Sequence, residues 1–220
     1  MNQNLFFTPT DILLPAHADM RRWSVIACDQ FTADAGYWQA VQDTVGDAPS
    51  TLRLMLPEFY LGKCDEAAAT REIQQTMRRY LDDGVFRTVP HSLVLVQRTL
   101  PGGTVRCGIV GALDLEAYDY APDSVTPIRA TEGTVASRLP ARVRIRAAAA
   151  LEMPHIMVFY SDPEDTIRRE AQAAAGETLY DFDLMSGGGH VRGLRIAGAK
   201  ADALAARLCA TGVGTDGAYP

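Results

Sequence analysis

The sequence predicts an α+β fold, in which a mixed β-sheet carries flanking helices. Of the 220 residues, 47% are hydrophobic and 22% are charged, a composition typical of a globular protein with a substantial core. Segments with strand periodicity and segments with helical periodicity follow one another irregularly rather than as regular βαβ units. Glycine-rich turns also join two pairs of β-rich runs, and these turns predict two hairpins.

In the first part of the chain, short strands are predicted to alternate with helices. Residues 24–28 are an apolar run that predicts a buried strand, and residues 35–45 have helical periodicity and end before a glycine. Residues 51–56 alternate between the two faces of a strand and are followed by a proline. Asp65 has the side chain of a helix N-cap, so we expect a helix over residues 66–83.

The middle of the chain is predicted to contain a hairpin, a helix and a strand. Residues 93–99 and 104–115 are rich in β-formers and flank a Pro-Gly-Gly turn, which predicts the first hairpin. An alanine-rich stretch predicts a helix over residues 142–151, and an apolar run predicts a strand over residues 155–160.

The last part of the chain is predicted to form two helices around the second hairpin. Asp162 is expected to cap a helix over residues 163–175, which has a proline in its first turn. Residues 180–185 and 191–196 are predicted strands joined by a Ser-Gly-Gly-Gly turn, and residues 199–210 have the pattern of an amphipathic helix.

Length and composition limit the classes of protein to be considered. We expect one domain over residues 1–210, followed by a flexible tail or truncated linker over residues 211–220. A net charge of -6 and a pI near 5.2 argue against a nucleic-acid-binding protein. No apolar run is long enough to predict a membrane span. Four cysteines without metal-site or disulfide spacing indicate free thiols in a cytoplasmic protein.

The strongest local feature is a cluster of arginines between residues 128 and 146 of this acidic chain. The cluster consists of Arg129, Arg138, Arg142, Arg144 and Arg146. A guanidinium suits phosphate or carboxylate groups, so the cluster could bind a small anion. The same arginines could instead form ion pairs with Glu132, Glu152 and the acidic run around Asp114. Composition alone leaves both interpretations open.

The remaining polar motifs are weaker. The glycine triplet Gly187–Gly189, just before His190, lacks the Lys-Ser/Thr of a phosphate-binding loop. It also precedes a predicted strand, so we interpret it as a hairpin turn. His155 precedes an apolar run, which favours a hydrogen-bonded core histidine over a catalytic one. Asp114, Glu116 and Asp119 could hold Mg²⁺, but a solvated strand end is the simpler interpretation. No histidine or cysteine spacing supports a bound metal.

Along nearly its whole length the sequence resembles the domain-of-unknown-function 1015 family. The resemblance rests on five long motifs, which are Trp23-Ser-Val-Ile-Ala-Cys-Asp-Gln-Phe31, Pro49-Ser-Thr-Leu-Arg-Leu-Met-Leu-Pro-Glu58, Ile128-Arg-Ala-Thr-Glu-Gly-Thr134, Leu151-Glu-Met-Pro-His-Ile156 and Leu179-Tyr-Asp-Phe-Asp-Leu-Met185 with the glycine turn and His190. That family in turn resembles the free serine kinases, which have a ParB/sulfiredoxin-like fold. The resemblance therefore implies that fold and a kinase that phosphorylates L-serine or a similar hydroxy amino acid.

The resemblance also implies roles for individual residues. Glu132 matches the catalytic glutamate of a His-Glu-x-Thr motif and would act as the base, and Thr134 matches its threonine, but Thr131 replaces the histidine. The substrate- and phosphate-binding residues implied are Asp29, Arg129, Thr134, Arg138, Arg142, Arg146, His155 and His190. Mg²⁺ with ATP or ADP would be the cofactors, and the partners would be a small-molecule substrate and, for assembly, a homodimer.

Two features of the resemblance lead to alternative functions. The Asp-Gly-(His/Asn)-His motif of the family is absent, and in the family it follows a region like residues 214–220. The chain is therefore expected to be the N-terminal part of a longer architecture. The replacement by Thr131 favours a non-catalytic nucleotide-binding or regulatory module, and a structural half-domain, inactive without its C-terminal part, is the third hypothesis.

Overall fold

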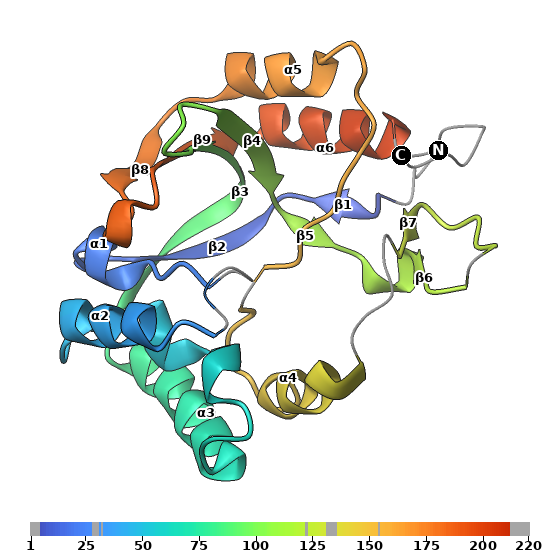
Figure 1. Cartoon of the computed structure of the whole chain (residues 1–220). Helices are drawn as coiled ribbons and strands as arrows, with labels where there is room; N and C mark the ends of the chain where they lie inside the picture. The colour runs from blue at the N-terminus through green and yellow to red at the C-terminus, as the bar shows by residue number, and fades with distance from the viewer. Residues whose placement is uncertain are drawn as a thin grey trace.

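The computed structural model describes residues 5–27, 31, 33–121, 123–130, 136–153 and 155–211. It confirms a fold that combines helices with β-sheets (Figure 1). The main sheet contains β2 (Thr10–Pro15), β3 (Phe86–Thr99), β4 (Val105–Val110), β8 (Thr178–Asp183) and β9 (His190–Ala197). All pairings in this sheet are antiparallel.

Strand β3 is the centre of the main sheet and is long enough to have different neighbours along its length. Its first half pairs with β2, and its second half pairs with β4 and β9. Strand β8 then pairs with the outer edge of β9. The two predicted hairpins, β3–β4 and β8–β9, are confirmed, although β3 begins seven residues earlier than predicted, at Phe86.

Two smaller pairings extend this architecture. Strand β1 (Phe7–Thr8) pairs antiparallel with β5 (Ala112–Leu113). Strand β6 (Tyr118–Asp119) pairs with β7 (Ile128–Arg129), and this is the parallel pair found within the described residues.

One face of the main sheet is covered by α5 (Thr166–Ala174) and α6 (Ala199–Thr211), which lie together in Figure 1. Leu93 and Leu95 on β3 and Ile196 on β9 are fully buried in this layer. They pack with Ile167 of α5 and Leu204 of α6 in one hydrophobic cluster. Because side chains alternate between the faces of a strand, the even-numbered residues near the end of β3 lie on the opposite face.

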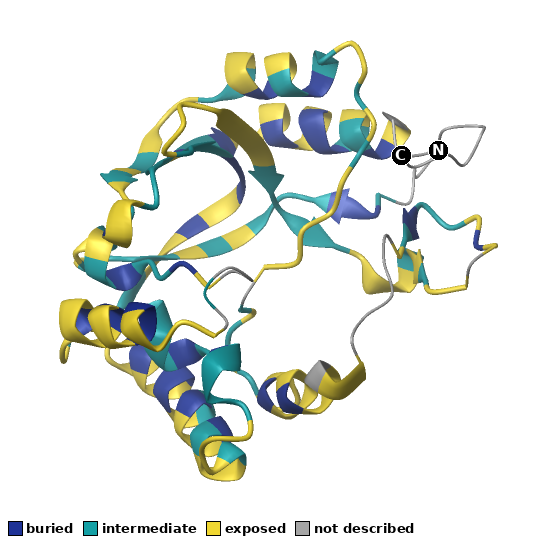
Figure 2. Cartoon of the chain, in the orientation of Figure 1, coloured by how far each residue is buried: buried dark blue, intermediate teal, exposed yellow. Residues whose placement is uncertain are grey.

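The remaining helices pack around two smaller hydrophobic clusters. These helices are α1 (Met20–Trp23), α2 (Ala35–Val45), α3 (Glu66–Asp82) and α4 (Leu139–Arg146). Trp23 and Met77 are central to one cluster, and Trp38 and Val41 to the other. The buried stripes on α2 and α3 are visible in Figure 2.

The helix predictions are largely confirmed. Helix α2 has the predicted bounds, and Asp65 caps α3 by accepting hydrogen bonds from the backbone N–H groups of Ala67 and Ala68, both at 3.0 Å. Helices α5 and α6 lie within a few residues of their predicted bounds. Helix α4 begins earlier than predicted and ends at Arg146, so the alanines that follow it form a turn instead.

Two of the three wrong strand predictions, residues 24–28 and 51–56, share a physical cause. Among the described residues 24–27, two backbone groups bond to side chains, and none is paired with a neighbouring strand. The Tyr37 hydroxyl donates to the Ile26 carbonyl at 2.5 Å, and the Val25 N–H donates to Thr51 Oγ1 at 3.3 Å. Residues 51–54 form a 3-10 helix capped by the side chain of Ser50.

The predicted strand over residues 155–160 is also wrong, because no described strand pairs with this segment. Its apolar side chains remain exposed, with Ile156 at 59%, Met157 at 79% and Phe159 at 62% of full exposure. An apolar run supplies strand propensity but no neighbouring edge, and a strand needs both.

Candidate functional site

The Ser186–Gly189 turn between β8 and β9 packs against two distant parts of the chain. A Cβ atom on Gly188 would lie 2.0 Å from Ile26 Cδ1, and one on Gly189 would lie 2.1 Å from the Thr99 oxygen. Gly189 also has a φ of 91°, which residues with a side chain rarely adopt. The interpretation of the triplet Gly187–Gly189 as a hairpin turn is therefore confirmed, and close packing explains Gly188 and Gly189.

His190 is the first residue of β9, and both of its ring nitrogens lie within hydrogen-bond distance of carboxylates. Its Nδ1 lies 2.8 Å from Asp183 Oδ1, and its Nε2 lies 2.6 Å from Asp181 Oδ1. Arg21 of α1 reaches Asp183 at 3.4 Å, and Arg192 reaches Asp181 at 3.4 Å. A carboxylate can only accept, so both imidazole nitrogens act as donors when the ring is protonated.

The surrounding charges shift the titration of this cluster. Hydrogen bonds to Asp183 and then to Asp181 raise the pKa of His190 above its ordinary value. The hydrogen bond from His190 lowers the pKa of Asp183. The cluster therefore favours an imidazolium between two carboxylates, which ties the β8–β9 hairpin to α1 through Arg21.

Arg98 lies near the end of β3, beside the Ser186–Gly189 turn (hereafter the glycine turn). It was not identified as a candidate from the sequence. Its Nη2 donates to the Gly188 carbonyl at 3.4 Å. Its Nε is buried and has no hydrogen-bond partner. The signal that could have identified it is an arginine two residues after the apolar run of residues 93–96, on a strand whose residues 92–95 are buried.

The arginines of α4 are engaged in ion pairs. Arg142 lies 2.6 Å from Glu58, and Arg144 lies 2.5 Å from Glu66. Arg146 pairs with Glu152, as the ion-pair interpretation predicted. For these three side chains the geometry favours ion pairing over a preformed anion site.

The other candidate residues are not brought together by the described structure. Asp29, Glu132 and Thr134 lie outside the described residues, as does the side chain of Arg138. Arg129 is half-buried in β7. His155 is exposed, so its interpretation as a core histidine is wrong, because the apolar run that follows it is exposed as well.

The predicted acidic cluster serves local backbone structure. Asp114 accepts a hydrogen bond from the Glu116 N–H at 3.0 Å, and Asp119 accepts one from the Ala121 N–H at 3.1 Å. Within the described residues, no group of three or more histidine, cysteine or acidic side chains is arranged to hold a metal ion. The solvated strand end is therefore the better interpretation.

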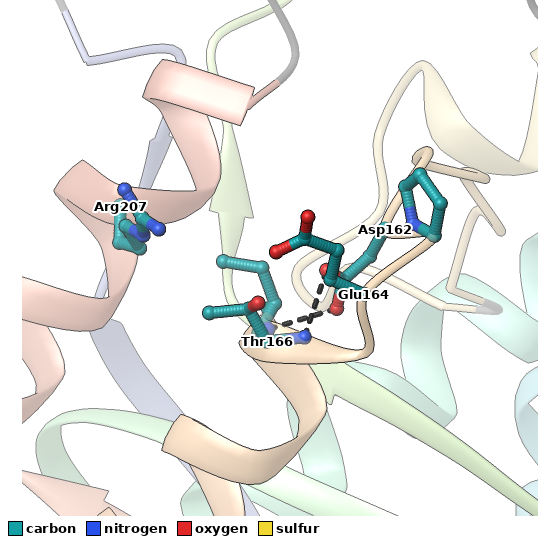
Figure 3. Close-up of a pocket in the computed structure, with 6 residues that line it drawn as sticks. Asp162, Glu164, Thr166 and Arg207 are labelled. Carbon is teal, nitrogen blue, oxygen red and sulfur yellow. Dashed lines mark hydrogen bonds between the residues drawn. The ribbon is translucent and has the colours of Figure 1, made fainter.

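A pocket of about 210 Å³ lies between the start of α5 and α6 (Figure 3). Asp162, Glu164 and Thr166 line one side, and Arg207 lines the other. Both carboxylate oxygens of Asp162 are used to cap α5, by accepting from Thr166 N–H at 2.9 Å and Ile167 N–H at 2.8 Å. The pocket therefore exposes a helix cap rather than a set of converging free polar groups.

Comparisons with known proteins place the chain in a family but assign it no activity. Across the described residues, no helix is long and apolar enough to cross a membrane. No curated protein and no solved structure matches the sequence. A family model described as "Protein of unknown function (DUF1015)" matches residues 9–211. Because this match covers most of the sequence, the chain belongs to the DUF1015 family.

Proposed function

We propose that this protein is a small-molecule kinase that phosphorylates serine or a similar hydroxy amino acid. One observation supports a ligand site in the described structure: two motifs far apart in sequence meet at the glycine turn. Ile26 of the first motif contacts Gly188, and Arg21, just before that motif, pairs with Asp183 of the last motif. Residues from several segments commonly converge in this way where a ligand is bound.

The chemistry of phosphoryl transfer determines the roles in this proposal. Transfer depends mainly on positioning the reactants and neutralising phosphate charge. In this proposal Glu132 accepts the proton of the substrate hydroxyl, and Thr134 and Asp29 bind the substrate or its phosphate. ATP or ADP would supply the phosphoryl group and leave as ADP or AMP, and Mg²⁺ would neutralise the charge of its phosphates. Arg129 and Arg138 neutralise charge in preference to Arg142 and Arg146, whose ion pairs with Glu58 and Glu152 support a structural role.

Turnover by the purified protein tests this function. The protein is incubated with Mg²⁺, ATP or ADP and a panel of hydroxy amino acids, and phosphorylated products are identified by mass spectrometry. Glu132→Gln should abolish product formation, while Glu164→Gln, an exposed carboxylate in the pocket at α5, should leave it unchanged. Wild-type turnover by Glu132→Gln would show that the assigned base is wrong.

A non-catalytic nucleotide-binding module is the second candidate, and Thr131 in the place of the family's histidine favours it. Nucleotide would then raise the melting temperature without any amino acid being phosphorylated. A structural half-domain is the third candidate, favoured by the three ion pairs of α4. It predicts neither nucleotide binding nor turnover. Light scattering by the purified protein distinguishes a monomer from a homodimer.

A further inference from the structure

The end of β3 presents a cationic side chain on the face of the sheet opposite α5 and α6. Leu93 and Leu95 pack in the core below those helices. Arg98 lies an odd number of residues from both, so strand alternation places it on the other face. There its guanidinium lies beside the glycine turn, with Nη2 3.4 Å from the Gly188 oxygen.

The side chain of Arg98 is half-buried and has few hydrogen-bond partners. Its Nε atom is shielded from solvent and donates no hydrogen bond. The contact to Gly188 is long, and among the described residues no carboxylate lies within ion-pair distance of Arg98. A buried donor without an acceptor is unfavourable, and this half-buried arginine also lacks a counter-ion.

A second arginine occupies the neighbouring position across the sheet. Arg106 on β4 lies directly opposite Arg98 in the β3–β4 register, so the two side chains share a face. Like charges at such positions repel each other, and within the described part of the chain Arg106 also has no acidic partner. An anion bound between the two guanidinium groups would offset this repulsion.

We propose that Arg98 and Arg106 form an oxyanion-binding site beside the glycine turn. The planar fork of a guanidinium matches phosphate and carboxylate oxygens, which are the groups this site would take. Arg98 supplies the directional contact from a half-buried side chain, and Arg106 supplies exposed positive charge. The identity of the natural ligand rests on the proposed function, in which the oxyanion belongs to the nucleotide or to the amino-acid substrate.

Titration with inorganic phosphate and, separately, with L-serine tests the site and distinguishes phosphate from carboxylate. Binding is measured by calorimetry and by the amide resonances of Gly187, Gly188 and Gly189. Arg98→Gln should weaken binding by about tenfold or more, the value expected for losing a charged hydrogen bond. Arg98→Lys retains the charge but loses the fork, so its affinity should be intermediate, and Arg106→Gln should have a smaller effect.

Arg87→Gln is the matched control, because Arg87 lies on the same strand and donates to a backbone carbonyl, that of Leu179, at 3.5 Å. It should bind both probes like the wild-type protein. Far-UV circular dichroism establishes that each variant is folded. The proposal is overturned if the wild-type protein binds neither probe, or if folded Arg98→Gln and Arg98→Lys bind the probes with wild-type affinity.

The outcome for this site can be separated from the outcome for the kinase. Arg98-dependent binding of phosphate or serine by a protein that phosphorylates no amino acid would support the site and reject the proposed function. Turnover that is equally fast in the wild-type protein and in Arg98→Gln, with unchanged affinity for both probes, would support the function and reject the site.

Discussion

The aromatic ring of Tyr180 fills the space that a side chain on Gly193 would occupy. The two residues are paired across β8 and β9, and a Cβ atom on Gly193 would lie 2.2 Å from Tyr180 Cζ. Burial by this packing raises the pKa of Tyr180 to about 12. The glycine is thus required by its neighbour rather than by its own backbone conformation.

Gly193→Ala should therefore destabilise the protein by about 1–3 kcal/mol, the usual cost of overpacking. Gly108→Ala is a matched control, because Gly108 and Gly193 are both paired with Val96 but a Cβ on Gly108 would contact nothing within 4 Å. Urea denaturation of the two variants measures the difference. Equal stabilities would show that the Tyr180 ring has room to move away.

The His190 cluster makes stability depend on pH in a defined direction. Because the pKa of His190 is raised in the folded protein, the imidazolium stabilises the fold fully below its unfolded value of 6.5. This contribution is lost as pH rises through the higher folded pKa. The difference in unfolding free energy between the wild-type protein and His190→Gln should thus be largest at about pH 5.5. It should decrease as the pH is raised past the folded pKa. Denaturation midpoints measured across this range would contradict the assignment if the difference stayed constant.

Helix α4 should depend on one buried side chain more than on its ion pairs. Ile145 is buried in the cluster around Trp23, so Ile145→Ala should cost about 2–5 kcal/mol. Arg144→Gln removes an ion pair in which 45% of the arginine side chain is exposed, and should cost less than about 1 kcal/mol. Chemical denaturation of both variants measures the ranking. If Arg144→Gln were the more destabilising change, the position of α4 would depend mainly on its ion pairs.

The capping of α5 gives a local test at the pocket. Asp162→Ala removes both hydrogen bonds to the first turn and should destabilise the protein by about 1 kcal/mol. Glu164→Ala changes an exposed carboxylate nearby and should have little effect. Thermal unfolding compares the two. Similar melting temperatures would mean that the α5 terminus does not rely on its cap.

Local signals explain which elements could be predicted from the sequence. Asp65 and Asp162 act on backbone groups within a few residues, so the starts of α3 and α5 could be inferred from nearby residues. The glycine turns of both hairpins are equally local. The predicted strand at residues 24–28 failed because its backbone partners, Tyr37 and Thr51, are distant side chains.

The same distinction separates the predicted and unpredicted parts of the candidate site. Glu152, one of the acidic partners considered for the arginine cluster, pairs with Arg146 six residues away, whereas the partners of Arg142 and Arg144 are the distant Glu58 and Glu66. The exposed position of His155 depends on tertiary structure that periodicity does not specify. Arg98 was missed for a related reason. Alternation along β3 indicates which residues share a face of the strand, but not which face the helices leave uncovered.

The position of β3 at the centre of the sheet has a consequence for the folding pathway. One edge of its second half can form a hairpin with β4 early, because those strands are adjacent in the chain. The other edge pairs with β9, which lies about a hundred residues further along the chain. Pairing over such a sequence separation is slow. Until β9 arrives, the apolar strand from Leu93 to Val96 offers an unpaired edge to other molecules. Aggregation of newly synthesised chains, rather than loss of native stability, is thus the failure expected when β9 is weakened.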